Sequence, residues 1–186
     1  MKVVGISGSP RENGNCNTLV ERFMTESAKS GAKTKSYVIN SMNNIKGCQA
    51  CGACKSKSEH CIIEDDLAEV LRDIETSDVV VYATPVYFGD ASAQFKLAFD
   101  RHYSFLKGHV ESRLPKGKQA VFILCQGHDD EKMYAEISKK YEGRFKFLGF
   151  SGFHPVHMTG ASAPDTAASR PEILTKIDNL VSEIIK

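Results

Sequence analysis

The sequence predicts an α/β fold, a doubly wound sheet of five parallel strands with helices on both faces. Strand patterns alternate with helical patterns along the whole chain, which favours right-handed β-α-β crossovers within one sheet. Two segments, residues 78–84 (DVVVYAT) and 119–125 (QAVFILC), are apolar on both faces. Such runs are typical of central strands in a parallel sheet that helices cover on both sides.

The expected elements follow one another in a regular order. Strands are expected at 2–7, 33–39, 78–84, 119–125 and within 147–158. Helices, in which apolar residues recur three and four positions apart, are expected at 17–29, 66–74, 95–103, 131–145 and 171–184. Asp65 or Asp66 is expected to cap the second helix. Ligands of such sheets bind beyond the carboxyl ends of the strands, so the loops at that edge are the places to search for a site.

Length and composition limit the class of protein. The chain has 186 residues, 41% hydrophobic and 25% charged, which suits one globular domain over residues 1–186. A net charge of +1 predicts no nucleic-acid partner, and no apolar run approaches the roughly 18–20 residues that span a membrane. The first residues pass directly into an apolar strand, so we expect no signal peptide and a cytoplasmic location.

The loop after the first strand, residues 7–18, is dense in hydroxyls, amides and glycines and carries one arginine. Such donors at the start of a helix are typical of a site for a phosphate monoester. The spacing matches neither the P-loop motif nor the G-x-G-x-x-G motif of dinucleotide-binding proteins. The alternative is a plain polar connector.

The loop expected after the third strand, residues 84–89, brings a proline and two adjacent aromatic residues to the same edge of the sheet. Backbone amides there could bind the polar edge of a ring system while a side chain packs on its face. Ordinary packing is the alternative for these aromatic residues. Together, the two loops outline a pocket for a phosphate at one end and an aromatic ring at the other.

Residues 4–11 (VGISGSPR), Asn17-Thr18 and residues 84–87 (TPVY) resemble the NAD(P)H-dependent FMN reductase-like branch of the flavodoxin-fold proteins. The resemblance implies a flavodoxin-like fold, FMN as cofactor, NAD(P)H as a possible electron donor, and a homodimer or homotetramer. His128 and Asp129 depart from the Gly/Ser-rich loop that many relatives have after the fourth strand. The FMN contacts that the resemblance implies are Ser7, Ser9, Arg11, Asn15, Asn17, Thr18, Pro85, Val86, Tyr87, Phe88, Gly89, Gly127 and His128.

Four of the six cysteines lie in a loop at residues 47–64, in the pattern Cys48-x₂-Cys51-x₂-Cys54-x₆-Cys61. In an intracellular protein such a cluster indicates metal binding or redox activity. The compact spacing suits a [4Fe–4S] cluster and resembles the iron–sulfur flavoprotein family, a subset of these flavin reductases. Zinc, a redox-active or vestigial cysteine set without a cluster, and a structural disulfide are the alternatives. The other two cysteines, Cys16 and Cys125, stand alone in the sequence, and Cys125 is expected to be a small buried hydrophobic residue.

The leading hypothesis is therefore an FMN-dependent oxidoreductase or electron-transfer flavoprotein that couples FMN to a [4Fe–4S] cluster and serves a small-molecule or protein redox partner. A flavin supplies the chemistry itself, and no acid–base pair stands out among the residues, so no catalytic side chain is assigned. One alternative is a cluster-free NAD(P)H-dependent FMN or quinone reductase. Another is a non-enzymatic module that binds FMN or senses a metal.

Overall fold

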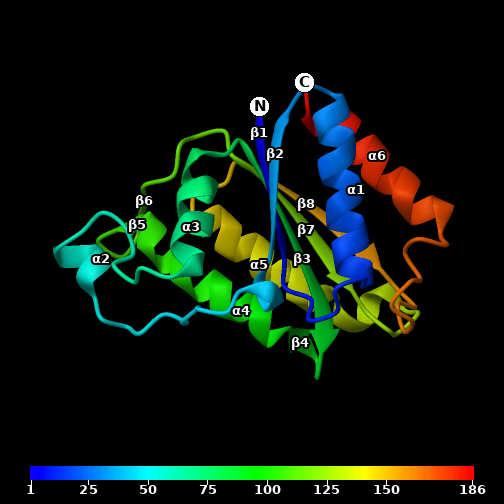
Figure 1. Ribbon diagram of the computed structural model, residues 1–186, viewed down its shortest axis with the longest axis horizontal. Helices are drawn as coiled ribbons and strands as arrows, with labels where there is room; N and C mark the ends of the chain where they lie inside the picture. The colour runs from blue at the N-terminus through cyan, green and yellow to red at the C-terminus, as the bar shows by residue number, and fades with distance from the viewer.

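Five parallel strands form the centre of the molecule in a computed structural model that describes residues 1–186. Their spatial order is β2 (Lys33–Val38), β1 (Lys2–Ser7), β3 (Val79–Tyr87), β7 (Gln119–Cys125) and β8 (Gly152–Met158) (Figure 1). This is the strand order of flavodoxin-like doubly wound sheets, with the switch point between β1 and β3. The predicted fold class is confirmed.

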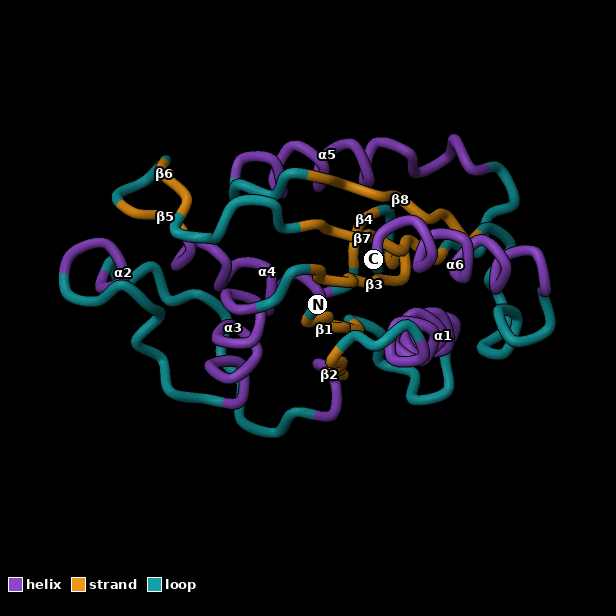
Figure 2. The backbone as a smooth tube through the Cα atoms, turned by 90° about the horizontal axis from the view of Figure 1, so that it is seen from above, coloured by secondary structure: helices purple, strands orange, loops and turns teal.

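Helices cover both faces of the sheet, as Figure 2 shows from above. Successive residues of a strand point to opposite faces, so Val79, Val81 and Ala83 of β3 lie in one core cluster and Val80 and Tyr82 in the other. The first cluster packs against α1 (Asn15–Lys29) and α6 (Pro171–Ile184). The second packs against α3 (Asp66–Thr76), α4 (Ala93–Asp100) and α5 (Ala135–Phe147).

Strand β3 is longer than the sequence predicts. Residues 84 and 85 continue the parallel pairing with β7, and Tyr87 then pairs with Asp90 of the short antiparallel strand β4 (Asp90–Ala91). Phe88 and Gly89 form the two-residue turn between them, with φ values of 49° and 84°. Two positive φ values are typical of a type I′ turn, whose twist matches that of a hairpin. The expectation of a loop over residues 84–89 is therefore wrong for residues 85–87.

Several short elements have no clear sequence pattern. The cysteine loop, residues 47–64, contains the one-turn helix α2 (Ala53–Ser56). A small hairpin is formed by β5 (Leu106–Lys107) and β6 (Glu111–Ser112). The remaining short elements are the 3₁₀ helices η1 (Ile39–Ser41), η2 (Arg101–Phe105), which continues α4, and η3 (Glu131–Tyr134). No helix is both long enough and apolar enough to cross a membrane.

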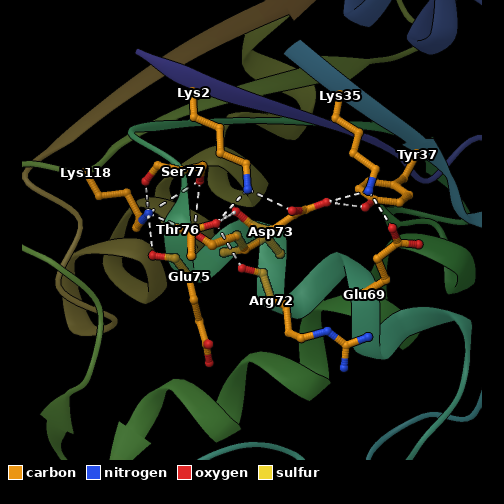
Figure 3. Close-up of polar contacts among 11 residues, drawn as sticks. Lys2, Lys35, Tyr37, Glu69, Arg72, Asp73, Glu75, Thr76, Ser77 and Lys118 are labelled. Carbon is orange, nitrogen blue, oxygen red and sulfur yellow. Dashed lines mark hydrogen bonds and ion pairs between the residues drawn. The ribbon is translucent and has the colours of Figure 1, made fainter. Parts of the chain in front are cut away.

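Helix α3 is fastened to the edge of the sheet through Asp73, as Figure 3 shows. One carboxylate oxygen accepts from Lys2 Nζ at 2.7 Å, and the other lies 2.8 Å from Lys35 Nζ and accepts from the Tyr37 hydroxyl. Burial alone would raise the pKa of Asp73, but these hydrogen bonds hold it well below its ordinary value. Asp73 thus fixes the helix that directly follows the cysteine loop.

The carboxyl end of α3 is held by Lys118, a buried residue that precedes β7. Its Nζ donates to the Ile74 carbonyl at 2.8 Å and to the Ser77 carbonyl (Figure 3). The ammonium group thereby satisfies carbonyls at the negative end of the helix dipole. Burial lowers the pKa of Lys118 to about 8.

Candidate functional site

A cavity of about 200 Å³ lies at the carboxyl edge of the sheet. We call it the carboxyl-edge cavity. It is built from the last residues of β3 and from the segments that follow β1, β7 and β8, because the carboxyl ends of parallel strands meet at one edge. Its lining residues are Ser9, Arg11, Asn15, Cys16, Pro85, Val86, Tyr87, Cys125, Gly127, Ala161 and Ser162.

The structure brings seven of the thirteen expected cofactor contacts to this cavity. They are Ser9, Arg11, Asn15, Pro85, Val86, Tyr87 and Gly127. The six that do not line it are Ser7, Asn17, Thr18, Phe88, Gly89 and His128. Phe88 projects from the β3–β4 turn and is fully exposed, while the His128 ring accepts a hydrogen bond from the Asp130 backbone at 3.0 Å.

Two of the expected contacts stabilise the loop after β1 from within. Asn17 Nδ2 donates to the carbonyls of Arg11 and Glu12 at 3.1 and 2.6 Å. The Thr18 hydroxyl donates to the Gly14 carbonyl at 3.3 Å, one turn back. These side chains therefore shape the loop, and their donors are already used.

Ser9 and Arg11 differ from those two residues because their donors remain available. The Ser9 oxygen accepts from the Arg11 backbone N–H at 3.2 Å, and its hydroxyl donates to no protein group. The Arg11 guanidinium makes one long contact, 3.5 Å to the Ser162 carbonyl. Both lie before α1, whose first N–H groups have no partner within the helix. An anion would find a convergent set of donors here.

The connection after β8 completes the cavity, and the sequence analysis did not include it. Asn15 Nδ2 donates to the Ala163 carbonyl at 2.7 Å, and Asn15 Oδ1 accepts from the Ala167 N–H at 2.7 Å. These bonds tie the start of α1 to residues 161–167. The predicted topology could have pointed to this connection, since it too follows the carboxyl end of a strand in the sheet.

Cys16 and Cys125 lie together at this cavity, both buried. A hydrogen bond with Cys125, together with burial, raises the pKa of the Cys16 thiol well above its ordinary value. Although the two cysteines are isolated in the sequence, the fold brings them together, because the carboxyl end of β7 meets the first turn of α1. Cys125 is buried as expected.

A second cavity, of about 350 Å³, lies at the cysteine loop, and we call it the cysteine cavity. All four cysteines of the loop line it, with Arg101, Tyr103 and Ser104 of η2 on the opposite wall. All four are free thiols, and no three His, Cys, Asp or Glu side chains are gathered closely enough to hold a single metal ion. Four soft ligands around one cavity are a donor set that suits iron and sulfide.

The two ends of the cysteine loop are joined at a neck. Asp66 exchanges backbone and side-chain hydrogen bonds with Asn44, and Asp65 Oδ2 accepts from the Lys46 N–H at 2.9 Å. Asp65 precedes α3 as expected, but its side chain caps no helical N–H. It binds instead to the buried Arg101, with Oδ2 2.9 Å from Nη1, because a buried guanidinium requires a carboxylate.

The cysteine cavity and the carboxyl-edge cavity share no lining residue. Figure 1 shows the cysteine loop with α2 beside β5 and β6, on the side of the sheet that carries α3. Within one chain, the two sites are therefore built from separate sets of residues.

Comparisons with known proteins agree with this architecture. A family model described as NADPH-dependent FMN reductase matches residues 1–136. An iron-sulfur flavoprotein from Archaeoglobus fulgidus is 40% identical over 142 residues, which cover 76% of this chain and 58% of the relative. One from Methanosarcina thermophila is 37% identical over 101 residues, covering 54% of this chain and 52% of the relative. The chain thus spans about half the length of the curated relatives it matches.

Solved structures share the fold at low sequence identity. The NAD(P)H:quinone oxidoreductase from Methanothermobacter marburgensis has a TM-score of 0.76 and 17% identity, with 100% of this chain and 96% of that chain covered. An FMN-dependent NADH-azoreductase from Bacillus anthracis, in complex with FMN, has a TM-score of 0.75 and 12% identity, with 100% and 99% covered. With the family model matched over residues 1–136, the chain belongs to the NADPH-dependent FMN reductase family.

Proposed function

We propose that the protein binds FMN in the carboxyl-edge cavity and acts as a flavin-dependent oxidoreductase. The observation that carries the proposal is that unused donors and the side chains of Pro85, Val86 and Tyr87 line one cavity. Ser9, Arg11 and the first turn of α1 would hold the phosphate, since helix N-termini and charged donors favour anions. Pro85, Val86 and Tyr87, with Gly127 opposite, would hold the ring.

Bound FMN would supply hydride and one-electron transfer, so the protein needs to bind and orient the cofactor. Tyr87 is partly exposed at the rim of the cavity, where a substrate or nicotinamide would approach the ring. NAD(P)H as donor, and a small molecule or redox protein as acceptor, are part of the proposal. A homodimer or homotetramer, measurable by sedimentation, is also part of it.

The finer proposal is a [4Fe–4S] cluster held by Cys48, Cys51, Cys54 and Cys61. The common cavity of these four thiols supports it, as do the names of the iron-sulfur flavoprotein relatives. Such a cluster would accept or donate one electron at a time. The protein would then join two-electron chemistry at the flavin to one-electron transfer.

Anaerobic purification followed by cofactor analysis tests both levels of the proposal. We expect about one FMN per chain and, after reconstitution, about four irons and four acid-labile sulfides. NAD(P)H should reduce the flavin. FMN without iron or sulfide would indicate a cluster-free FMN or quinone reductase. Bound FMN that no electron donor reduces and no acceptor oxidises would indicate a binding module. Absence of FMN binding would contradict the proposal.

A further inference from the structure

One guanidinium closes the neck of the cysteine loop. The Arg101 side chain is completely buried. It donates to the Lys46 carbonyl just before the loop, to the Ile63 carbonyl near the end of the loop and to Asp65 Oδ2 just after it, each at 2.9 Å. A single side chain from η2 therefore joins both ends of the segment that carries the four thiols.

The same guanidinium also contacts a cysteine sulfur. Arg101 Nε donates to Cys61 Sγ at 3.1 Å. Cys61 lies between the cysteine cavity and a neighbouring cavity of about 520 Å³ on the α3 side. A side chain placed between two cavities has space on both sides, so the contact with Arg101 fixes the direction of this sulfur.

Two other cations join the loop to the rest of the chain without contacting a sulfur. Lys55 Nζ donates to the carbonyls of Tyr103 and Leu106. Arg113 Nη1 donates to the carbonyls of Cys54, Glu59 and Ser104 at 3.1, 2.8 and 2.9 Å. Arg113 is thus a matched comparison for Arg101, since it is an arginine that binds the same loop through backbone oxygens only.

We infer that Arg101 is a positioning residue for the cluster site, which closes the neck of the cysteine loop and donates an N–H···S hydrogen bond to Cys61. The inference rests on the proposed cluster. Hydrogen bonds to ligand sulfurs and nearby charge help to set the potential of an iron–sulfur cluster. Reduction adds negative charge, so a buried guanidinium beside Cys61 stabilises the reduced form and raises the reduction potential.

The test compares Arg101→Lys with Arg113→Lys in the anaerobically reconstituted full chain. Arg101→Lys keeps a positive charge beside Asp65 but removes the planar fork that reaches both neck and sulfur. We expect a more negative cluster potential and iron release to a chelator about 10-fold faster or more. Arg113→Lys should leave the potential unchanged. FMN content and circular dichroism, expected to be unaltered, report folding in both variants.

A double variant, Arg101→Gln with Asp65→Asn, controls for misfolding. Loss of Arg101 alone would leave the buried Asp65 carboxylate without its partner, and the second substitution removes that charge. The double variant should shift the potential in the same direction as Arg101→Lys. If both Arg101 variants show the same cluster potential and the same rate of iron release as the wild type, the inference is overturned, while the proposed cluster stands. Wild-type protein that takes up neither iron nor sulfide would contradict the proposed cluster and the inference with it.

Discussion

The Tyr82 hydroxyl lies 2.5 Å from Nε2 of His102 in the buried core between the sheet and α4. His102 Nδ1 lies 3.2 Å from the Ala98 carbonyl, which can only accept a hydrogen bond, so Nδ1 carries the proton. Nε2 then accepts from the Tyr82 hydroxyl. Both side chains are neutral, and burial lowers the pKa of His102 to about 3.

This neutral histidine predicts an acid-sensitive core. The unfolded state, in which histidine titrates near 6.5, binds more protons than the folded state between about pH 3 and 6.5, so stability falls as pH falls through that window. We expect the free energy of unfolding to be about 2 kcal/mol lower at pH 5 than at pH 7.5 because of His102. Urea denaturation at several pH values measures it. His102→Gln should flatten this dependence, whereas His60→Gln, at an exposed histidine, should not.

The phosphate end of the carboxyl-edge cavity is tested by two hydroxyls of the same loop. Ser9→Ala removes an unused donor and should weaken FMN binding by about 1.5–3 kcal/mol, the value of a hydrogen bond to a charged group. Thr18→Ala should have a smaller effect, because this hydroxyl already donates to the Gly14 carbonyl. Fluorescence titration of the apoprotein measures both. Equal affinities of wild type and Ser9→Ala would place the phosphate elsewhere.

The cluster ligands are tested by cysteine variants. Cys51→Ser and Cys54→Ser should each abolish retention of iron and sulfide, because a hydroxyl is a poor ligand for iron in such clusters. FMN should remain bound, since the two cavities share no residue. Cys125→Ala, at a cysteine outside the loop, should keep its iron. Full iron content in both serine variants, measured after anaerobic reconstitution, would rule out these ligands.

The polar network at α3 is tested by Asp73→Asn. The pKa of Asp73 is lowered in the folded state, so its stabilisation is present above the unfolded value near 4 and is lost as pH falls towards the folded value. We expect the variant to lose about 1–2 kcal/mol at pH 7, because the lysine partners are partly exposed. Denaturant titration measures the loss. Glu64→Gln, at a largely exposed carboxylate, should be neutral.

The central strands could be predicted because their residues are apolar on both faces. Val79–Ala83 and Ala120–Leu124 are fully buried, as central strands of a parallel sheet covered by helices are. Residues Pro85–Tyr87 were harder to assign, because a proline and a polar flank look like the start of a loop. Their extended conformation depends on pairing with Cys125 and with β4, which is tertiary information.

The site was predictable where its chemistry is local in sequence. Ser9, Arg11 and the four clustered cysteines signal their proposed roles by type and spacing. Arg101 gives no such signal, since it looks like one more polar residue within the helix expected at 95–103. Its role depends on Lys46, Cys61 and Asp65, which are 36 to 55 positions away along the chain.

The paired residues 44–46 and 63–66 make the cysteine segment a side branch of the chain. Because its ends already meet, the flavodoxin-like scaffold does not require what lies between them. A chain in which a short Gly/Ser linker replaces residues 47–62 should therefore still fold and bind FMN, as circular dichroism and flavin titration would measure. Loss of folding in that chain would show that the branch is part of the scaffold. In design terms, the segment is a transplantable insert, and a flavodoxin-like protein that lacks it could receive it together with an arginine at the position of Arg101.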